Sequence, residues 1–163
     1  PVMPTNLYGP NDNFDLNTSH VLPALIRKFH EAKQEDADFV TIWGTGKPRR
    51  EFLHADDLVD ACIYLMNIAD NRLSLKDSPL FNIGTGIDLT INQLARLIGG
   101  TIGFKGKIIN DFSKPDGTPQ KLLDTTKLKN LGWQPEISLS HGIQQIYKWY
   151  KDVKVKNPDP ILR

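Results

Sequence analysis

The sequence predicts an α/β fold, in which strands and helices alternate along the chain. Short apolar runs bounded by Gly-rich turns occur at 39–43 and 80–83, and such runs are typical of short strands. Between these runs, apolar residues recur with the spacing of an amphipathic helix, as they do from Leu22 to Phe29. A helix-start signal, the capping-box sequence TINQ at 90–93, follows the second strand. Periodicity alone predicts no more than this class.

The first part of the chain predicts a strand end, a loop and a helix. Residues 1–19 form an apolar run followed by a stretch rich in Asn, Asp, Gly and Pro. The helix is predicted from Leu22, with Ser19 as its cap, and Pro23 is tolerated because it falls in the first turn. Its apolar face consists of Leu22, Leu25, Ile26 and Phe29.

The middle of the chain predicts two strands and a second helix. A strand at 39–43 ends at the turn GTGKP, and 51–53 is a second short strand. A helix is expected from about Asp56, with His54 and the following acids at its start. One face of this helix carries Leu58, Cys62, Leu65 and Ala69.

The last part of the chain continues the alternation. A buried strand at 80–83 stops at GTG, and the capping box begins a helix that runs to about Ile98. A strand at 107–110 is followed by a loop at 113–119. Asp124 is expected to cap a short helix that ends at Gly132. The last helix is marked by Ile143, Ile146, Tyr147 and Tyr150.

Composition excludes some classes of function. The 163 residues include 20 basic and 19 acidic side chains, a net charge of +1, which gives no global reason to expect nucleic acid or a membrane as partner. No apolar run has the length of a transmembrane helix, and the start has no signal-peptide pattern. The single cysteine, Cys62, fits a reducing compartment, so we expect a cytoplasmic location. Cys62 itself is expected to be a small core residue.

Two polar segments are candidates for a binding site, and each has two interpretations. The first, PTNLYGP at 4–10, is either a capped turn or the ligand-binding carboxyl edge of an open α/β sheet. The second, WGTGKPRREFLHADD at 43–57, has a Gly-rich turn beside clustered cations, a combination that suits phosphate. Its other interpretation is a solvated hairpin whose arginines pair with Glu51 and Asp56. The spacing around His54 lacks the His or Cys pairs of a metal site.

A third segment, KPDGTPQKLLD at 114–124, combines a Pro-Asp-Gly turn with charges, as in a loop that closes over a polar ligand. Together with SHVLPALIRKFHEA at 19–32 and LGWQPEISL at 131–139, these segments resemble the extended short-chain dehydrogenase/reductase family. Within it they are similar to the GDP-fucose synthases. The resemblance covers residues 1 to about 150. It implies the C-terminal part of an NAD(P)-binding Rossmann fold with a small α/β substrate-binding domain.

The resemblance implies an NADP-dependent reaction, in which GDP-4-keto-6-deoxy-D-mannose is epimerised at carbons 3 and 5 and then reduced to GDP-L-fucose. It implies nicotinamide-side NADP contacts at Pro4, Thr5, Asn6, Leu7 and His20. Inverting a carbon beside a ketone needs an acid as well as a base, and the resemblance assigns the acid to His20. It implies substrate contacts at Lys28, Trp43, Arg50 and Asp116, with Arg50 on the diphosphate.

Residue types alone leave other interpretations open: Lys28 as an exposed helix lysine, Trp43 as core, and His20 as a helix-start residue. Arg49, outside the REF element, is expected to be solvated. The chain opens within an apolar run and lacks the family's Gly-rich loop, catalytic Ser, Tyr-x-x-x-Lys pair and base Cys. We therefore expect a fragment, inactive alone, of a protein that forms a homodimer at full length.

We expect residues 1–150 to combine the end of the Rossmann domain with the substrate-binding domain, and 151–163 to be a charged tail. Two other functions remain possible from the sequence: a related GDP- or UDP-sugar dehydratase or epimerase, and a non-catalytic nucleotide-sugar-binding module.

Overall fold

The computed structural model describes residues 1–68 and 80–155 of the chain. The helices are α1 (Val21–Gln34), α2 (Ala55–Asn67), α3 (Ile91–Ile102), α4 (Thr126–Asn130) and α5 (Leu139–Trp149), with a π-helical segment at Tyr150–Val155. The strands are β1 (Val2–Pro4), β2 (Asn6–Tyr8), β3 (Phe39–Trp43), β4 (Arg49–His54), β5 (Phe81–Ile83), β6 (Asp88–Thr90), β7 (Lys107–Asp111) and β8 (Gln120–Lys121). The predicted α/β class is confirmed.

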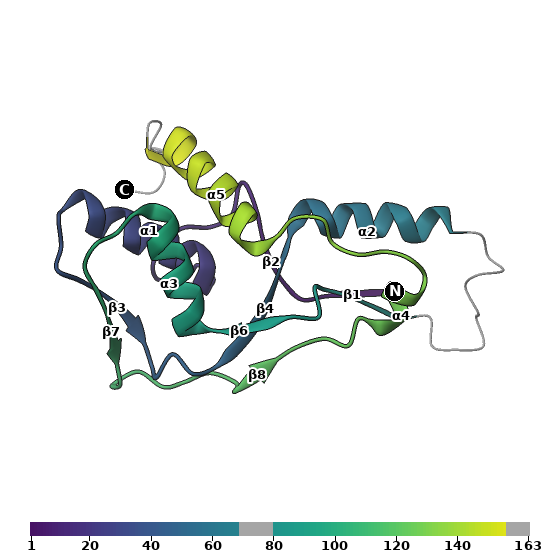
Figure 1. The fold of residues 1–163 in the computed structure, drawn as a ribbon, viewed down its shortest axis with the longest axis horizontal. Helices are drawn as coiled ribbons and strands as arrows, with labels where there is room; N and C mark the ends of the chain where they lie inside the picture. The colour runs from purple at the N-terminus through teal and green to yellow at the C-terminus, as the bar shows by residue number, and fades with distance from the viewer. Residues whose placement is uncertain (69–79, 156–163) are drawn as a thin grey trace.

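The strands form three small sheets, and the central one is built on β4. Within it β2 and β8 run parallel to β4 and β6 runs antiparallel to it, while β1 pairs with β5 and β3 with β7, both in parallel. Figure 1 shows β4 crossing the middle of the molecule, between the β3–β7 end and the β1–α4 end. Because Tyr8 is the register partner of His54, β2 and β4 end at the same edge of this sheet.

Two apolar clusters form the core, and β4 contributes a residue to each, Phe52 to the larger and Leu53 to the smaller. The larger cluster joins α1, α3 and α5 with β3, and Figure 1 shows these helices gathered at one end of the molecule. Phe29, Ile98 and Ile143 are fully buried in it. The smaller cluster surrounds Leu53 and Ile83, with α2 and α4 packed on it. Because Phe52 and Leu53 are adjacent, β4 connects the two clusters.

Helix α1 forms as the periodicity predicts, but its start differs. Its four predicted apolar positions are all buried. The residue that caps it is His20, whose backbone is extended, and not Ser19; within the described residues no side chain caps this helix. The prediction for Ser19 was wrong because a serine one residue before the cap is too far from the first free N–H groups.

The other helix starts follow the predicted signals more closely. His54 caps α2, and its Nδ1 accepts the Asp56 N–H at 3.2 Å. The capping box of Thr90 and Gln93 is complete, but α3 continues past Ile98 to Ile102. Before α4, the Asp124 carboxylate accepts the Thr126 N–H at 2.9 Å, although the cap position belongs to Thr125.

Several strands differ from expectation. β4 is longer than 51–53, and β6 and β8 were not predicted because each is too short for periodicity to register. The run at 80–83 is only partly buried, since Leu80 is exposed while Ile83 is enclosed. Ala69 lies outside the described residues. So do residues 156–163 of the expected tail, and the π-helical segment before them extends α5. Among the described residues, no helix combines the length and apolar character needed to cross a bilayer.

Candidate functional site

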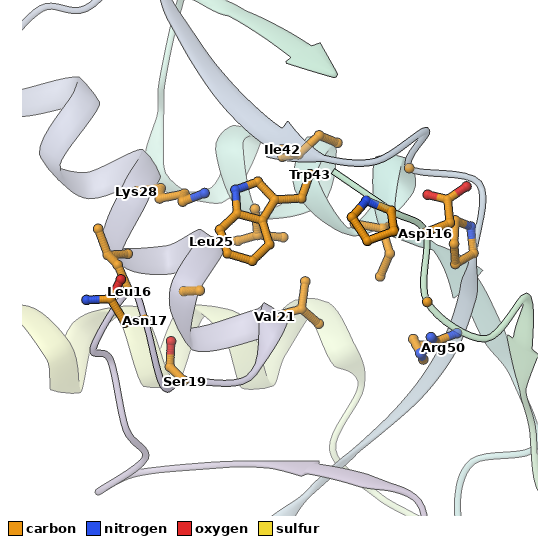
Figure 2. Close-up of a pocket in the computed structure, with 16 residues that line it drawn as sticks. Leu16, Asn17, Ser19, Val21, Leu25, Lys28, Ile42, Trp43, Arg50 and Asp116 are labelled. Atoms are coloured by element: carbon orange, nitrogen blue, oxygen red, sulfur yellow. The ribbon is translucent and has the colours of Figure 1, made fainter. Parts of the chain in front are cut away.

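A cavity of about 300 Å³ lies between the start of α1, the end of β3 and the loop after β7. It is lined by all four residues expected to contact substrate: Lys28, Trp43, Arg50 and Asp116. Figure 2 shows the Trp43 indole across the middle, with Lys28 on one side and Arg50 and Asp116 on the other. Four residues from three distant segments of the sequence thus meet at one cavity.

The Trp43 indole forms a wall of this cavity and remains largely open, with 60% of the residue exposed. Lys28 and Lys114 place their ammonium groups 5.5 and 5.6 Å from the ring centroid, within the range of cation–π attraction. Lys28 also donates to the Thr41 carbonyl at 3.3 Å, and its partial burial lowers its pKa below that of an ordinary lysine. An exposed, flat ring at a cavity wall is suited to stacking on a nucleotide base. The core interpretation of Trp43 is therefore wrong.

Asp116 closes the loop after β7 onto the Gly-rich turn after β3. Its two carboxylate oxygens accept the Thr45 N–H at 2.8 Å and the Thr45 hydroxyl at 2.7 Å. These bonds lower the pKa of Asp116, the hydroxyl contributing most. Gly44 has a φ of 69°, and a Cβ at this position would collide with Asp116 Oδ1, so glycine is needed for the approach. The carboxylate thus edges the cavity in its charged form.

Arg50 is held at the floor of the cavity by carbonyl groups. Its Nη1 donates to the Arg49 carbonyl at 2.7 Å and to the Thr118 carbonyl at 2.6 Å. The second bond joins β4 to the loop that carries Asp116. A guanidinium carries five N–H donors, so the two bonds to carbonyls leave donors available for an anion within the part of the chain that the structure describes.

A second, more open cavity of about 780 Å³ adjoins the first. Thr5, Asn6, Leu7 and His20, four of the five residues expected to contact NADP, line it; Pro4, which lies in β1 opposite Ile83, does not. The amide nitrogen of Asn6 donates to the Glu51 carbonyl at 2.7 Å, which fixes this side chain at the cavity wall. His20 is exposed at the start of α1.

The two cavities meet at Ser19, Val21 and Arg50, which line both. Arg50 therefore stands between the aromatic cavity and the one that holds His20. A ligand with a base at one end, a small ring at the other and an anionic linker between them matches this succession. The edge-of-sheet interpretation of PTNLYGP agrees with it, because the loop after β2 lines the second cavity.

Sequence reasoning missed Lys121 as part of the site. It lies on β8 as the register partner of Arg50 and lines the second cavity, so two cations stand next to each other at the junction. The signal was present, because Lys121 belongs to the KPDGTPQKLLD segment. Only the pairing of β8 with β4 shows that this lysine adjoins Arg50.

Arg49, expected to be solvated, has a side chain that is 41% exposed, and it also pairs with Asp88. Its Nη2 lies 2.6 Å from Asp88 Oδ1. The hairpin interpretation was wrong for Glu51, which is fully buried and accepts the N–H groups of Gly86 at 2.7 Å and Leu123 at 3.0 Å. The adjacent arginines thus have different roles: Arg49 pairs with Asp88 of β6, and Arg50 lines the cavities.

Tyr8 and His54 are structural in this arrangement. The Tyr8 ring is buried and packs edge-on against His54, with centroids 5.3 Å apart. Burial, with a smaller effect of Asp57, raises the pKa of Tyr8 well above its usual value, which keeps the phenol neutral. Asp57 in turn accepts the N–H groups of Glu136 and Ile137, both at 3.1 Å. The FLHADD segment therefore organises the start of α2.

The fold and the paired cavities define an α/β protein with a two-part binding site, and sequence comparison gives the family. Residues 1–84 match the NAD dependent epimerase/dehydratase family, and the chain belongs to that family. It is 55% identical to GDP-L-fucose synthase 1 of Arabidopsis thaliana and 51% identical to GDP-L-fucose synthase of Escherichia coli (strain K12), over 91% of this chain in both cases. The resemblance drawn from the motifs is confirmed.

Solved structures give the same placement. A GDP-L-fucose synthetase from Naegleria fowleri bound to NADP superposes with a TM-score of 0.82 at 28% identity, over 96% of this chain and 47% of its own. UDP-glucose 4-epimerase from Thermotoga maritima, with UDP-glucose, gives 0.76 at 26% identity, over 93% of this chain and 45% of its own. The chain spans less than half the length of these curated relatives, 44% of the Arabidopsis protein and 47% of the Escherichia coli protein.

Proposed function

We propose that this chain is the sugar-nucleotide half of an NADP-dependent epimerase–reductase that converts GDP-4-keto-6-deoxy-D-mannose to GDP-L-fucose. The observation that carries the proposal is the succession of sites across the two cavities: Trp43 and Asp116, then Arg50 with Lys121, then His20. The names of the similar proteins support GDP as the nucleotide.

In this proposal the first cavity binds the guanosine. The indole of Trp43 stacks on the base, and Asp116 accepts hydrogen bonds from the nucleoside. The guanidinium of Arg50 binds the diphosphate, for which a permanently charged, planar donor is apt. Lys121 adds a second positive charge beside it.

The second cavity then receives the keto sugar, with His20 at its wall. A proton on carbon next to a ketone is exchangeable because the carbanion is stabilised as an enolate, and His20 acts as the acid that returns a proton to that carbon. Thr5, Asn6 and Leu7 form the wall against which the nicotinamide end of the cofactor is held, and the fixed Asn6 amide suits a planar polar group. NADPH, when bound, supplies the hydride that reduces the ketone. The proposal includes a cytoplasmic location and a homodimer for the full-length protein.

Nucleotide titration tests the proposal. Calorimetry should show that the chain binds GDP, and binds it more tightly than UDP, because a purine covers more of the indole than a pyrimidine does. The full-length protein should turn over GDP-4-keto-6-deoxy-D-mannose with oxidation of NADPH. Preference for UDP would favour a UDP-sugar enzyme, and GDP binding without turnover would favour a non-catalytic binding module.

A further inference from the structure

The hydroxyl of Ser19 is buried beside the site. Within residues 1–68 and 80–155, Ser19 Oγ is closed off from water and has no hydrogen-bonding partner. Its backbone N–H donates to the Asp15 carbonyl at 2.9 Å, so the loop is held without the side chain. His20, not Ser19, occupies the cap position of α1. The hydroxyl therefore has no structural task in this part of the chain.

An unpaired buried hydroxyl destabilises the fold, because folding removes its hydrogen bonds to water and no hydrogen bond within the protein replaces them. Buried polar groups in folded proteins are nearly always paired, so an exception points to a partner that comes from elsewhere. Alanine would allow the same backbone without this cost. The place of Ser19 indicates what the partner is.

Ser19 lies where the two cavities meet. It lines both of them, as do Val21 and Arg50. Val21 has no polar side-chain group, so Ser19 and Arg50 supply the side-chain donors of this shared boundary. Figure 2 shows Ser19 and Arg50 on either side of Val21, along the edge of the cavity opposite the Trp43 indole.

The ends of the paired cavities suit other parts of the ligand. The carboxylate of Asp116 edges the first cavity, where it would repel a phosphate and accept N–H or O–H groups instead. Asn6 and His20 also line the second cavity, and its other lysine or arginine, Lys121, is the register partner of Arg50 at the boundary. The anionic linker of a sugar nucleotide therefore belongs at the boundary between them.

We propose that Ser19 is a binding residue for the diphosphate of the sugar nucleotide, its hydroxyl donating to a phosphate oxygen while Arg50 binds the same group. This inference rests on the proposed function. Rotation about the Cα–Cβ bond of Ser19 turns the hydroxyl toward the boundary, and the ligand supplies the partner that the fold leaves missing. A hydroxyl adds a short, uncharged and directional donor where Arg50 supplies charge.

Calorimetric titration of this chain with GDP and with guanosine tests the inference. Ser19→Ala should weaken GDP binding about tenfold, the usual effect of losing a hydrogen bond to a charged group, and leave guanosine binding unchanged. Its thermal midpoint should equal or exceed that of the wild type, because the variant removes an unpaired buried group. A serine needed only for structure would instead lower the midpoint. Ser140→Ala, at an exposed position on α5, is the matched control and should change neither quantity.

Arg50→Ala distinguishes a failure of the Ser19 inference from a failure of the proposed function. If Arg50→Ala weakens GDP binding while Ser19→Ala binds GDP as the wild type does, the role of Ser19 is overturned and the proposed function stands. Equal losses of GDP and guanosine in Ser19→Ala would also overturn it, because the effect would not lie at the diphosphate. If the wild-type chain binds no GDP, both proposals fall.

Discussion

Arg49 and Arg50 are neighbours on β4 with different surroundings, and this difference gives the first prediction. Arg50 lines both cavities, whereas Arg49 pairs with Asp88. Arg50→Ala should weaken GDP binding tenfold or more, since a hydrogen bond to a charged group contributes about 1.5–3 kcal/mol. Arg50→Lys should lose less GDP affinity than Arg50→Ala, because lysine keeps the positive charge but not the planar, two-pronged donor of the guanidinium. Calorimetric titration of GDP measures both.

Arg49→Ala is the control for this series. It should leave GDP affinity close to that of the wild type and lower the thermal midpoint, because β6 loses its ion pair with β4. A larger loss of affinity in Arg49→Ala than in Arg50→Ala would show that the diphosphate contact belongs to the other arginine.

His20 gives the second prediction, made for the full-length enzyme. His20→Gln should keep the fold and the affinity for cofactor, because the His20 side chain is exposed and only the backbone of this residue caps α1. General acid–base groups contribute about 100- to 10,000-fold, and epimerisation should slow by that order. Solvent deuterium incorporation at carbons 3 and 5 of the sugar is the measurement. Inversion at the wild-type rate would return His20 to a structural role.

The family resemblance and the residue types allowed individual residues of the candidate site to be predicted, but not their surroundings. Residue type alone favoured core for Trp43, which is instead 60% exposed, because exposure depends on what the rest of the chain places opposite a side chain. It favoured solvent for Arg49, whose side chain is 41% exposed, but it did not predict the ion pair with Asp88. The grouping of Lys28, Trp43, Arg50 and Asp116 follows from the fold, since α1, β3, β4 and a distant loop must meet. No sequence signal shows that the Ser19 hydroxyl lacks a partner among the residues that the structure describes.

At the scale of elements, the third prediction concerns the Glu51 carboxylate, which connects β4 to the segments after β5 and β8. It is fully buried and accepts N–H groups from Gly86, after β5, and Leu123, after β8. In Glu51→Gln, an NH2 group replaces one of the two accepting oxygens. This NH2 group faces a backbone N–H, so one buried hydrogen bond is lost. The free energy of unfolding should fall by about 2 kcal/mol or more in urea denaturation. Glu35→Gln, at an exposed position, is the matched control, and an equal effect in both variants would contradict the role of Glu51.

The pairing of β6 with β4 gives the fourth prediction, on pH. Hydrogen bonds from Arg49, and then from Gln120, lower the pKa of Asp88 below the ordinary 3.8. A carboxylate with a lowered pKa stabilises the fold above its unfolded value, and this stability is lost as pH falls through the folded value. The stability advantage of the wild type over Asp88→Asn should therefore be present near neutral pH and shrink below about 3.8.

Urea denaturation at neutral and acid pH measures this difference. Asp38→Asn, at an exposed position, serves as the control. An advantage over Asp88→Asn that is the same at both pH values would show that the ion pair adds nothing to stability.

Element prediction succeeded where the local signal was complete. The apolar spacing of α1 and the capping box of α3 each identified a helix, because both depend on residues close together in the sequence. β6 and β8 were missed because their existence depends on β4, which lies far from both in sequence. The end of α3 was placed too early because the left-handed cap falls at Gly103, and the earlier pair Gly99 and Gly100 is helical.

At the scale of the whole molecule, exposed apolar surface gives the fifth prediction. One face of α2 carries Val59, Ile63 and Met66, the last 77% exposed, and β1 exposes Val2 and Met3. Exposed apolar faces of this kind favour association. The apparent mass of the chain in light scattering should rise with concentration, and Ile63→Glu should reduce this rise. A monomer at every concentration would contradict the prediction.

The boundary formed by Ser19, Val21 and Arg50 has a consequence for the length of the ligand. Because the aromatic cavity and the cavity of His20 lie on opposite sides of this boundary, the linker sets how far the sugar reaches. In the proposed binding mode, two phosphates carry the hexose past Arg50, whereas a sugar joined to guanosine through one phosphate is expected to stop short of His20. We therefore expect the site to select the length of the linker, and sugars on nucleoside monophosphates should be poor substrates even when their base and hexose are correct.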